Sequence, residues 1–442
     1  MSIDTFLLSS DTTDLNYPEV RPTLDLNFAR VKALDPRITF TRASGGSYVG
    51  ADGLIKYAGV NEPRFDHDPV TGESLGFLVE GSRTNLTLYS GDFSQAHWSK
   101  ISLSIFTANT IIAPDGTLTG SFIAFQNASS YLTSAQGLQP NTSISAGTNT
   151  LSCFAKIGTA RYLALGLSNN GGEMSTAIFD LQTGTVKGAN SHPSFTVNGT
   201  SISNAGAGWY RCSLTSTYAA GMAAHISSST SGLLGAYYEF TVSGDGTSGI
   251  YVWGAQLETG IPAGSVTLLG LGPTSYIPTE GSTRTRAADN ATITGTNFSS
   301  WYNTIKGGGT IFTRYADNLV KNTNPGHTFS FNGGGVRWLS NWGSYQVYDG
   351  IVSIGGAPPN NRTSPVSEAG ALEVTADGIA RQSVARNGIV FVQNGGKVRI
   401  TGMTQLSIGY SSNTLQYLTG TFSRLTYWPK KLTDAQLQVL TR

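Results

Sequence analysis

The sequence predicts an all-β protein, and three observations support this fold class. Charged residues make up only 12% of the 442 residues, against a usual share of about 25%, while Gly is abundant at 54 residues. Short runs of β-branched and aromatic residues recur along most of the chain. Turn-forming residues separate these runs, as at Asp52-Gly53 and Asn387-Gly388, where Gly tolerates positive φ. We therefore expect strands throughout.

Composition excludes several classes of partner. The net charge of +1 gives no general attraction to nucleic acid or anionic lipid. The first ten residues lack the basic region of a signal peptide, and no apolar run approaches the ~20 residues of a membrane span. Cys153 and Cys212 are too few for a disulfide scaffold. They could face each other across strands, and we expect free, buried thiols in a protein assembled in a reducing cytoplasm.

The segment 1–35 has no clear hydrophobic period, and Pro18 and Pro22 interrupt any regular element. Segments of this composition are usually ordered only by a neighbour. We expect an attachment arm that another subunit or another protein of the same assembly holds. The alternative is an arm that folds back onto its own domain.

The segment 36–100 reads as short strands with tight turns between them. An ordered set of motifs runs through it: Phe40–Ser44 (FTRAS), Asp52-Gly53, Asn61–Asp66 (NEPRFD) and Gly76–Asn85 (GFLVEGSRTN). In this order the motifs resemble a module of tailed-bacteriophage virion proteins, of the head-spike or head-fibre type. The structural signature that this resemblance carries onto the chain consists of Arg42, Arg64, Glu80, Arg83 and Asn85.

Within that signature, Glu80 is expected to pair with Arg64 or Arg83 and so to hold the module together. Such a pair matters if it is buried, because a buried charge without its partner is costly.

The segment 101–259 is predicted to be a two-sheet jelly roll of about eight strands. Its motifs Phe179–Gly184, Gly208–Cys212 and Tyr251–Glu258 are similar to those of carbohydrate-binding-module jelly rolls in phage proteins. The connector 260–289 is Pro-stiffened, and we expect it to pack back against 36–100.

The segment 290–442 is predicted to be a second sandwich, with a hairpin at Asn387-Gly388 and one clear helix over 433–440. Gly420–Pro429 (GTFSRLTYWP) directly before that helix resembles the corresponding stretch of concanavalin A-like lectin and laminin-G-like sandwiches.

Sequence motifs of catalysis are missing: there is no Gly-x-Ser-x-Gly elbow, no phosphate-binding loop and no zinc-ligand spacing. Asp66-His67-Asp68 could hold a metal, but Asp next to Pro favours a turn. Glu239 and Glu258 are the best-placed carboxylates for a glycosidase, which needs two of them. We expect no catalytic residues, no metal, no cofactor and no enzymatic activity.

Aromatic side chains provide the binding hypothesis, because sugar rings stack on Trp and Tyr faces. The alternative is that these residues are core, which we expect for Trp209, Trp253 and Trp428. The candidates for glycan binding are Trp338, Trp342, Tyr345, Tyr348 and Tyr251, with Trp253 beside the last.

Together, the resemblances imply a non-enzymatic protein of the virion surface, made and assembled in the cytoplasm of a bacterial host. It would be a head fibre, spike or decoration that attaches through its N-terminal region and displays β-sandwiches able to bind host glycans. Partners would be capsid, neck or tail proteins and sister subunits in a homotrimer, with neither nucleic acid nor membrane insertion. The alternatives are a tail or collar adhesin and, less favoured, a glycan depolymerase.

Overall fold

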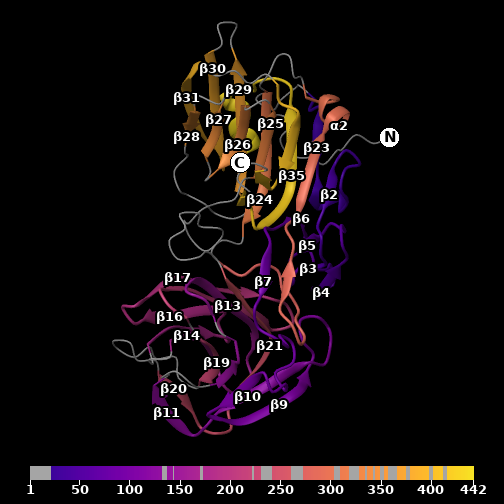
Figure 1. Cartoon of the computed structure of the whole chain (residues 1–442). Coiled ribbons are helices and arrows are strands. Elements are labelled where there is room, and N and C mark those ends of the chain that lie inside the picture. The colour runs from indigo at the N-terminus through magenta and orange to yellow at the C-terminus, as the bar shows by residue number, and fades with distance from the viewer. Residues whose placement is uncertain are drawn as a thin grey trace.

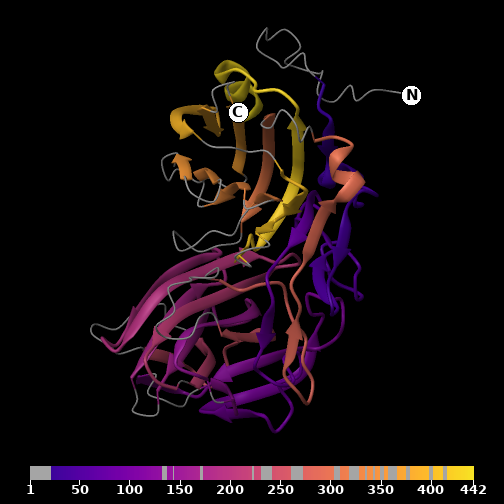
Figure 2. The ribbon, with the colours of Figure 1, turned by 45° about the horizontal axis from the view of Figure 1, so that its top comes forward.

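The fold is nearly all β, which confirms the predicted class. The computed structural model describes residues 21–131, 137–142, 144–169, 173–221, 223–229, 241–259, 272–302, 309–317, 328–333, 336–341, 344–348, 353–356, 366–374, 379–397, 402–411 and 416–442. Two bodies of packed sheets lie one above the other, and short strands of the N-terminal segment lie beside them (Figures 1 and 2).

Two sheets form the upper sandwich. The first has the order β31-β30-β29-β24-β35-β6-β5, with β1 added to β35. The second has the order β2-β23-β32-β25-β26-β27-β28. Their bounds are β31 Ile389–Lys397, β30 Ile379–Arg386, β29 Val366–Val374, β24 Gly309–Asp317, β35 Gly420–Trp428, β6 Ser74–Val79, β5 Phe65–His67, β1 Leu24–Leu26, β2 Thr39–Thr41, β23 Asn290–Thr294, β32 Gln405–Ile408, β25 Phe329–Gly333, β26 Val336–Asn341, β27 Ser344–Tyr348 and β28 Ser353–Gly356.

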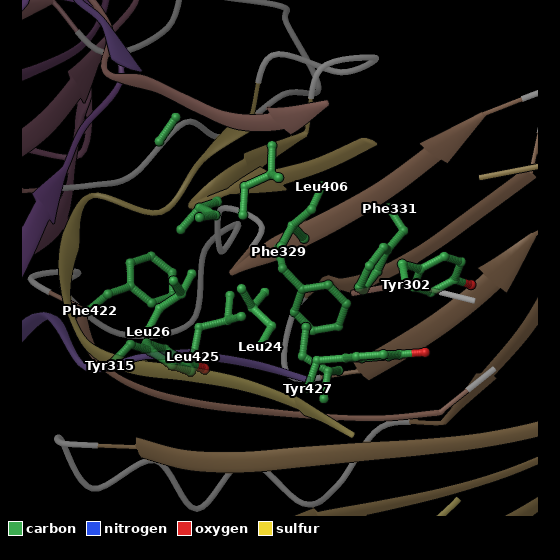
Figure 3. Packing of buried hydrophobic residues seen from close by; sticks show 14 of the residues in the cluster. Leu24, Leu26, Tyr302, Tyr315, Phe329, Phe331, Leu406, Phe422, Leu425 and Tyr427 are labelled. Atoms are coloured by element: carbon green, nitrogen blue, oxygen red, sulfur yellow. The ribbon is translucent and has the colours of Figure 1, made fainter. Parts of the chain in front are cut away.

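Residues 21–35 do not stand apart as an arm, which corrects that part of the arm prediction. Leu24 and Leu26 alternate with polar residues, so β1 buries both leucines while it pairs with β35, with Leu24 opposite Tyr427. Figure 3 shows both leucines among the aromatic side chains of the upper core. Residues 1–20 lie outside the described part of the chain.

The lower sandwich also has two sheets. One has the order β17-β18-β13-β21-β10-β9, with β7 pairing both β21 and β22, and the other has the order β16-β15-β14-β19-β12-β8. Their bounds are β17 Phe195–Asn204, β18 Trp209–Tyr218, β13 Gly147–Lys156, β21 Gly249–Thr259, β10 Gly120–Phe125, β9 Leu103–Ile111, β7 Arg83–Asn85, β22 Arg284–Arg286, β16 Thr185–Ser191, β15 Met174–Asp180, β14 Tyr162–Ser168, β19 Ala223–Ser229, β12 Gly137–Pro140 and β8 Trp98–Ile101.

Three two-stranded ladders and three helices complete the described elements. Gly53, at φ 76°, lies in the turn of the hairpin β3–β4 and confirms the predicted Asp52-Gly53 turn. Thr433 caps helix α3 through a capping box, as its sequence predicted. The bounds are β3 Gly46–Val49, β4 Ile55–Ala58, β11 Ala128–Tyr131, β20 Thr241–Gly244, β33 Tyr410–Ser411, β34 Gln416–Tyr417, α1 Phe28–Val31, α2 Gly295–Ser299 and α3 Asp434–Leu440.

The segment 36–100 contributes strands to both sandwiches. Strand β6 extends the upper sheet beside β35, and β2 pairs with β23 of the facing sheet. Strand β8 pairs with β12 of the lower sandwich. This segment therefore links the two bodies through backbone hydrogen bonds.

Candidate binding cleft

The two faces of the lower sheet β17-β18-β13-β21 differ in chemistry. Cys212, Cys153 and Ile202 are cross-strand partners on the face that packs into the apolar core. Cross-strand partners share a face, so Ser203, Arg211 and Phe154 lie together on the opposite, outer face. The outer face is rich in hydroxyl groups, since Thr, Ser and Asn occupy alternate positions of these strands.

The connector 272–283 covers part of this outer face. Tyr276 packs its ring against Trp253, with ring centroids 4.7 Å apart, and against Phe154 at 6.0 Å. Glu258 is buried and accepts hydrogen bonds from both the backbone N–H and the hydroxyl of Thr274. These contacts place the connector over β13 and β21.

A cleft of about 960 Å³ remains where the connector, the outer face and the strands of the 36–100 segment meet. Its floor is formed by β17 and β18, which lie at the top of the lower sandwich (Figure 1). The principal polar lining residues are Ser47, Tyr48, Asp66, His67, Asp68, Asn198, Thr200, Ser201, Ser203, Asn204, Arg211, Thr274 and Ser275.

Several lining groups are open to a ligand. The hydroxyls of Ser203 and Tyr48 have no hydrogen-bond partner among the described residues, and both residues are at least partly exposed. The side-chain oxygens of Asn198 and Asn204 accept hydrogen bonds from Thr217 Oγ1 and Gly206 N, which leaves their amide N–H groups facing outward to solvent or ligand. The cleft thus offers both donors and acceptors.

Two carboxylates stand in the opposite wall. Burial raises the pKa of Asp66 to about 6, although the hydrogen bond from Val49 N–H and the charge of Arg64 oppose that shift. Hydrogen bonds from the N–H groups of Thr71 and Val70 lower the pKa of Asp68. The turn begins at Asp68, whereas Asp66 and His67 belong to strand β5, so the turn interpretation of Asp66-His67-Asp68 holds only from Asp68 onward. The described residues contain no cluster that could hold a metal ion.

Arg211 and His67 complete the charged lining. The guanidinium of Arg211 donates to Thr274 O at 2.6 Å and to Ser152 Oγ at 3.3 Å, and it lies 5.3 Å above the Phe154 ring. His67 Nδ1 lies 3.0 Å from Val49 O, an acceptor, so Nδ1 carries the proton. Both side chains are therefore fixed by the protein itself.

A buried ion cluster lies behind this wall. Arg64 contacts Glu80 at 2.8 Å and Asp289 at 2.5 Å, and Arg42 contacts Asp289 at 3.0 Å. Arg286 Nε is 3.4 Å from Glu80, which makes Arg64 and Arg286 the cationic partners of that carboxylate. Together the cationic partners hold the pKa of Glu80 at about 2 against the opposing effect of burial.

The other two signature residues lie on β7. Arg83 donates to Ser82 O at 3.0 Å. Asn85 is fully buried and donates to Ala255 O and Ile277 O while it accepts from Leu257 N–H. The Asn85 side chain therefore joins β7, β21 and the connector.

Among the aromatic candidates for glycan binding, only the side chain of Tyr251 is described, and it does not line this cleft. Trp342 lies outside the described residues, and Trp338, Tyr345 and Tyr348 lie on β26 and β27, whose backbone pairing is described but whose side chains are not. Tyr251 is half-buried on β21 and packs against Phe122, with ring centroids 5.3 Å apart.

The tryptophans predicted to be core are core. Trp209, Trp253 and Trp428 have exposed fractions of 1%, 2% and 5%. The sequence does not reveal the cleft, because the groups that line it are common Ser, Thr, Asn and Asp residues. Alternation of hydroxyl residues along β17 was the one available signal.

Of the two carboxylates considered for a glycosidase, Glu239 lies outside the described residues and Glu258 is buried against Thr274. Cys153 and Cys212 are free, buried thiols on directly opposed positions of β13 and β18, as expected. No helix in the described part of the chain has the length and apolar character needed to cross a membrane.

No protein-family model and no curated protein matches the chain. Among solved structures, the CBM40 module of the Ruminococcus gnavus IT-sialidase is 18% identical and covers 31% of this chain and 85% of its own, with a TM-score of 0.25. Mouse laminin α1 domains LG4-5 are 12% identical, with 68% and 84% coverage and a TM-score of 0.18. The LG1-3 region of the laminin α2 chain is 13% identical, with 87% and 68% coverage and a TM-score of 0.21. Matches at these identities and TM-scores assign neither a function nor a ligand to the chain.

Proposed function

We propose that the protein is a non-enzymatic, carbohydrate-binding protein displayed on the surface of a tailed-bacteriophage virion. The observation that carries the binding role is the cleft, whose wall and floor present hydroxyl, amide and carboxylate groups with hydrogen-bonding capacity that the described chain does not use. The virion role is supported by the ordered motifs of residues 40–85, which resemble a virion module.

A saccharide fits the chemistry of this cleft. Sugar hydroxyls both donate and accept, so they need a mixture of acceptors and donors such as Asp66, Ser203 and the Asn198 amide. The volume of about 960 Å³ lies at the upper end of ordinary small-molecule sites. The floor stands on paired strands, so its groups are held in place before the ligand arrives.

Display on a particle requires an attachment segment. Because residues 21–35 belong to the upper sandwich, we assign attachment to residues 1–20 together with exposed surface of the 36–100 segment. A homotrimer on many-copy particles would multiply weak glycan contacts by avidity. The same binding site would serve a tail or collar adhesin, which differs only in its position on the virion.

A second candidate function, cleavage of glycans, is favoured by one observation. Asp66 and Asp68 share a cleft, and their environments shift their pKa values in opposite directions, as a general acid and its partner carboxylate require. The hydrogen bonds that Asp68 accepts from two backbone N–H groups favour a positioning role instead.

A glycan array combined with a reducing-sugar release assay separates these functions. Retained binding without release of reducing ends is expected; release would overturn the non-enzymatic assignment, and failure to bind any glycan would overturn the binding role. For the virion role, the full chain and a variant lacking residues 1–20 are supplied to particles that lack the protein. The full chain should load and the truncated chain should not, whereas equal loading would overturn the assignment of attachment to residues 1–20.

A further inference from the structure

The two carboxylates of the cleft wall are fixed in position by the backbone. Asp66 Oδ1 accepts a hydrogen bond from Val49 N–H at 2.6 Å. Asp68 Oδ1 accepts from the N–H groups of Val70 and Thr71, both at 2.8 Å. Asp66 lies in β5 and Asp68 directly follows this strand, and both residues line the cleft.

Each carboxylate keeps acceptor capacity for a ligand. Asp66 also accepts from His67 N–H and Asp68 from the Thr71 hydroxyl, but a carboxylate offers about four acceptor sites. Both side chains are partly exposed and both line the cleft. The wall therefore presents two carboxyl groups that are held in a fixed orientation. Each is either ionised or able to ionise.

Positive charge in the cleft is not offered to a ligand. Arg211 is the only Lys or Arg among the described lining residues, and its guanidinium already donates to Thr274 and Ser152, while its Nε is buried. Glu80 also lines the cleft, but it is neutralised by Arg64 and Arg286. His67 donates Nδ1–H to Val49 O, and its Nε2 is buried.

From this arrangement we infer that the cleft takes an uncharged saccharide, whose hydroxyls donate to Asp66 and Asp68, and that it rejects acidic saccharides. Ser203 and the amide of Asn198 on β17 contact the opposite edge of the sugar. This inference rests on the proposed carbohydrate-binding function and adds the class of ligand and the residues that select it.

The free-energy cost of burying the Asp66 carboxylate supports a binding role for this residue. Burial raises the pKa of Asp66 to about 6, so the ionised form is disfavoured in the folded protein at neutral pH. Groups that reduce stability are characteristic of sites where function requires them. A ligand hydroxyl that donates to the carboxylate would restore the hydrogen bonding that burial removes.

The test measures affinities at pH 7.5 by calorimetry for matched oligosaccharides taken from the array. Each pair consists of a neutral oligosaccharide and its counterpart oxidised at one C6 to a uronic acid, so that only a carboxylate differs. The neutral member should bind at least about tenfold more tightly, because like charges repel in a partly desolvated site.

Variants connect this preference to the residues. Asp66→Asn and Asp68→Asn should each weaken binding of the neutral sugar about tenfold or more, as expected for a lost hydrogen bond to a charged group, and should narrow the difference between the two sugars. Ser203→Ala, on the floor of the cleft, should weaken both sugars equally. Asp52→Asn is the matched control, since Asp52 is exposed, pairs with Lys56 and does not line the cleft.

The outcomes separate this inference from the function on which it rests. Equal or tighter binding of the acidic member, or unchanged affinities in both Asp variants, overturns the inference while the carbohydrate-binding function stands. Binding of neither member, nor of any other glycan, overturns both.

Discussion

Arg42 Nη1 and Asp289 Oδ1 form a fully buried ion pair at 3.0 Å, although the two residues are 247 positions apart in the chain. The second oxygen of Asp289 contacts Arg64 at 2.5 Å and accepts from Glu80 N–H at 2.9 Å. One carboxylate therefore ties three positions of the 36–100 segment to the residue that precedes β23. The wall of the cleft is built on this cluster.

Replacement of Asp289 by Ala should destabilise the protein strongly. The change leaves Arg42 and Arg64 buried without a shared counter-charge, and breaking a buried pair in this way costs about 3–5 kcal/mol. The free energy of unfolding from denaturant titration measures the effect.

The control for this measurement is Asp25→Ala. Asp25 also forms a long-range pair, with Arg424 at 2.7 Å, but this pair is partly exposed and should contribute at most about 1 kcal/mol. Similar losses from the two variants would contradict a special role for the buried cluster.

Asp66→Asn should stabilise the protein at pH 7.5 and leave its stability nearly unchanged at pH 4. The folded-state pKa of about 6 lies above the ordinary value of 3.8, so the folded chain holds this proton while the unfolded chain loses it. The stability that Asp66 contributes is present below the lower pKa and is lost as the pH rises through 6. Asn mimics the protonated side chain, so the gain at pH 7.5 should be about 1–3 kcal/mol.

Denaturant titrations of both proteins from pH 4 to pH 8 check this expectation. A gain that does not change with pH would show that ionisation of Asp66 is not its source. If Asp66→Asn gains stability while it loses affinity for saccharide, a general loss of structure cannot explain the weaker binding.

Local chemistry made part of this fold predictable from the sequence. Asn387 and Gly388 both have positive φ between β30 and β31, as the dipeptide indicated, and Thr433 caps α3. The buried thiols Cys153 and Cys212 could likewise be predicted, because each lies in a strand whose buried and outward-facing residues alternate. In all these cases the determining contacts are local or follow the period of one strand.

The remainder depends on contacts between distant segments. The pairing of β1 with β35 joins residues about 400 positions apart, and nothing in Leu24-Asp25-Leu26 specifies that partner. The cleft has the same property, because its walls come from residues near 48–70, 198–211 and 273–276. Alternation identifies which side chains share a face, but it does not identify which other segment covers that face.

Cys153 and Cys212 should resist alkylation in the native protein. Both thiols are fully buried, and burial raises the pKa of each, so almost no reactive thiolate exists at pH 8. Iodoacetamide labelling followed by mass spectrometry should show modification only above the denaturant midpoint. Labelling of either thiol well below that midpoint would show that the sheet containing β13 and β18 opens locally.

Leu24→Ala should reduce the free energy of unfolding by about 2–5 kcal/mol, because the side chain is 1% exposed and packs in the core of the upper sandwich.

Removal of residues 1–20 leaves β1 in place, so that truncated protein should unfold at nearly the same denaturant concentration as the full chain. Removal of residues 1–26 also deletes β1 and exposes the edge of β35 beside Leu425 and Tyr427, so its unfolding midpoint should fall at least as far as that of Leu24→Ala. An unchanged midpoint after the longer truncation would contradict the place of β1 in this sheet. A loss of particle loading in the shorter truncation, with its midpoint unchanged, would separate attachment from folding.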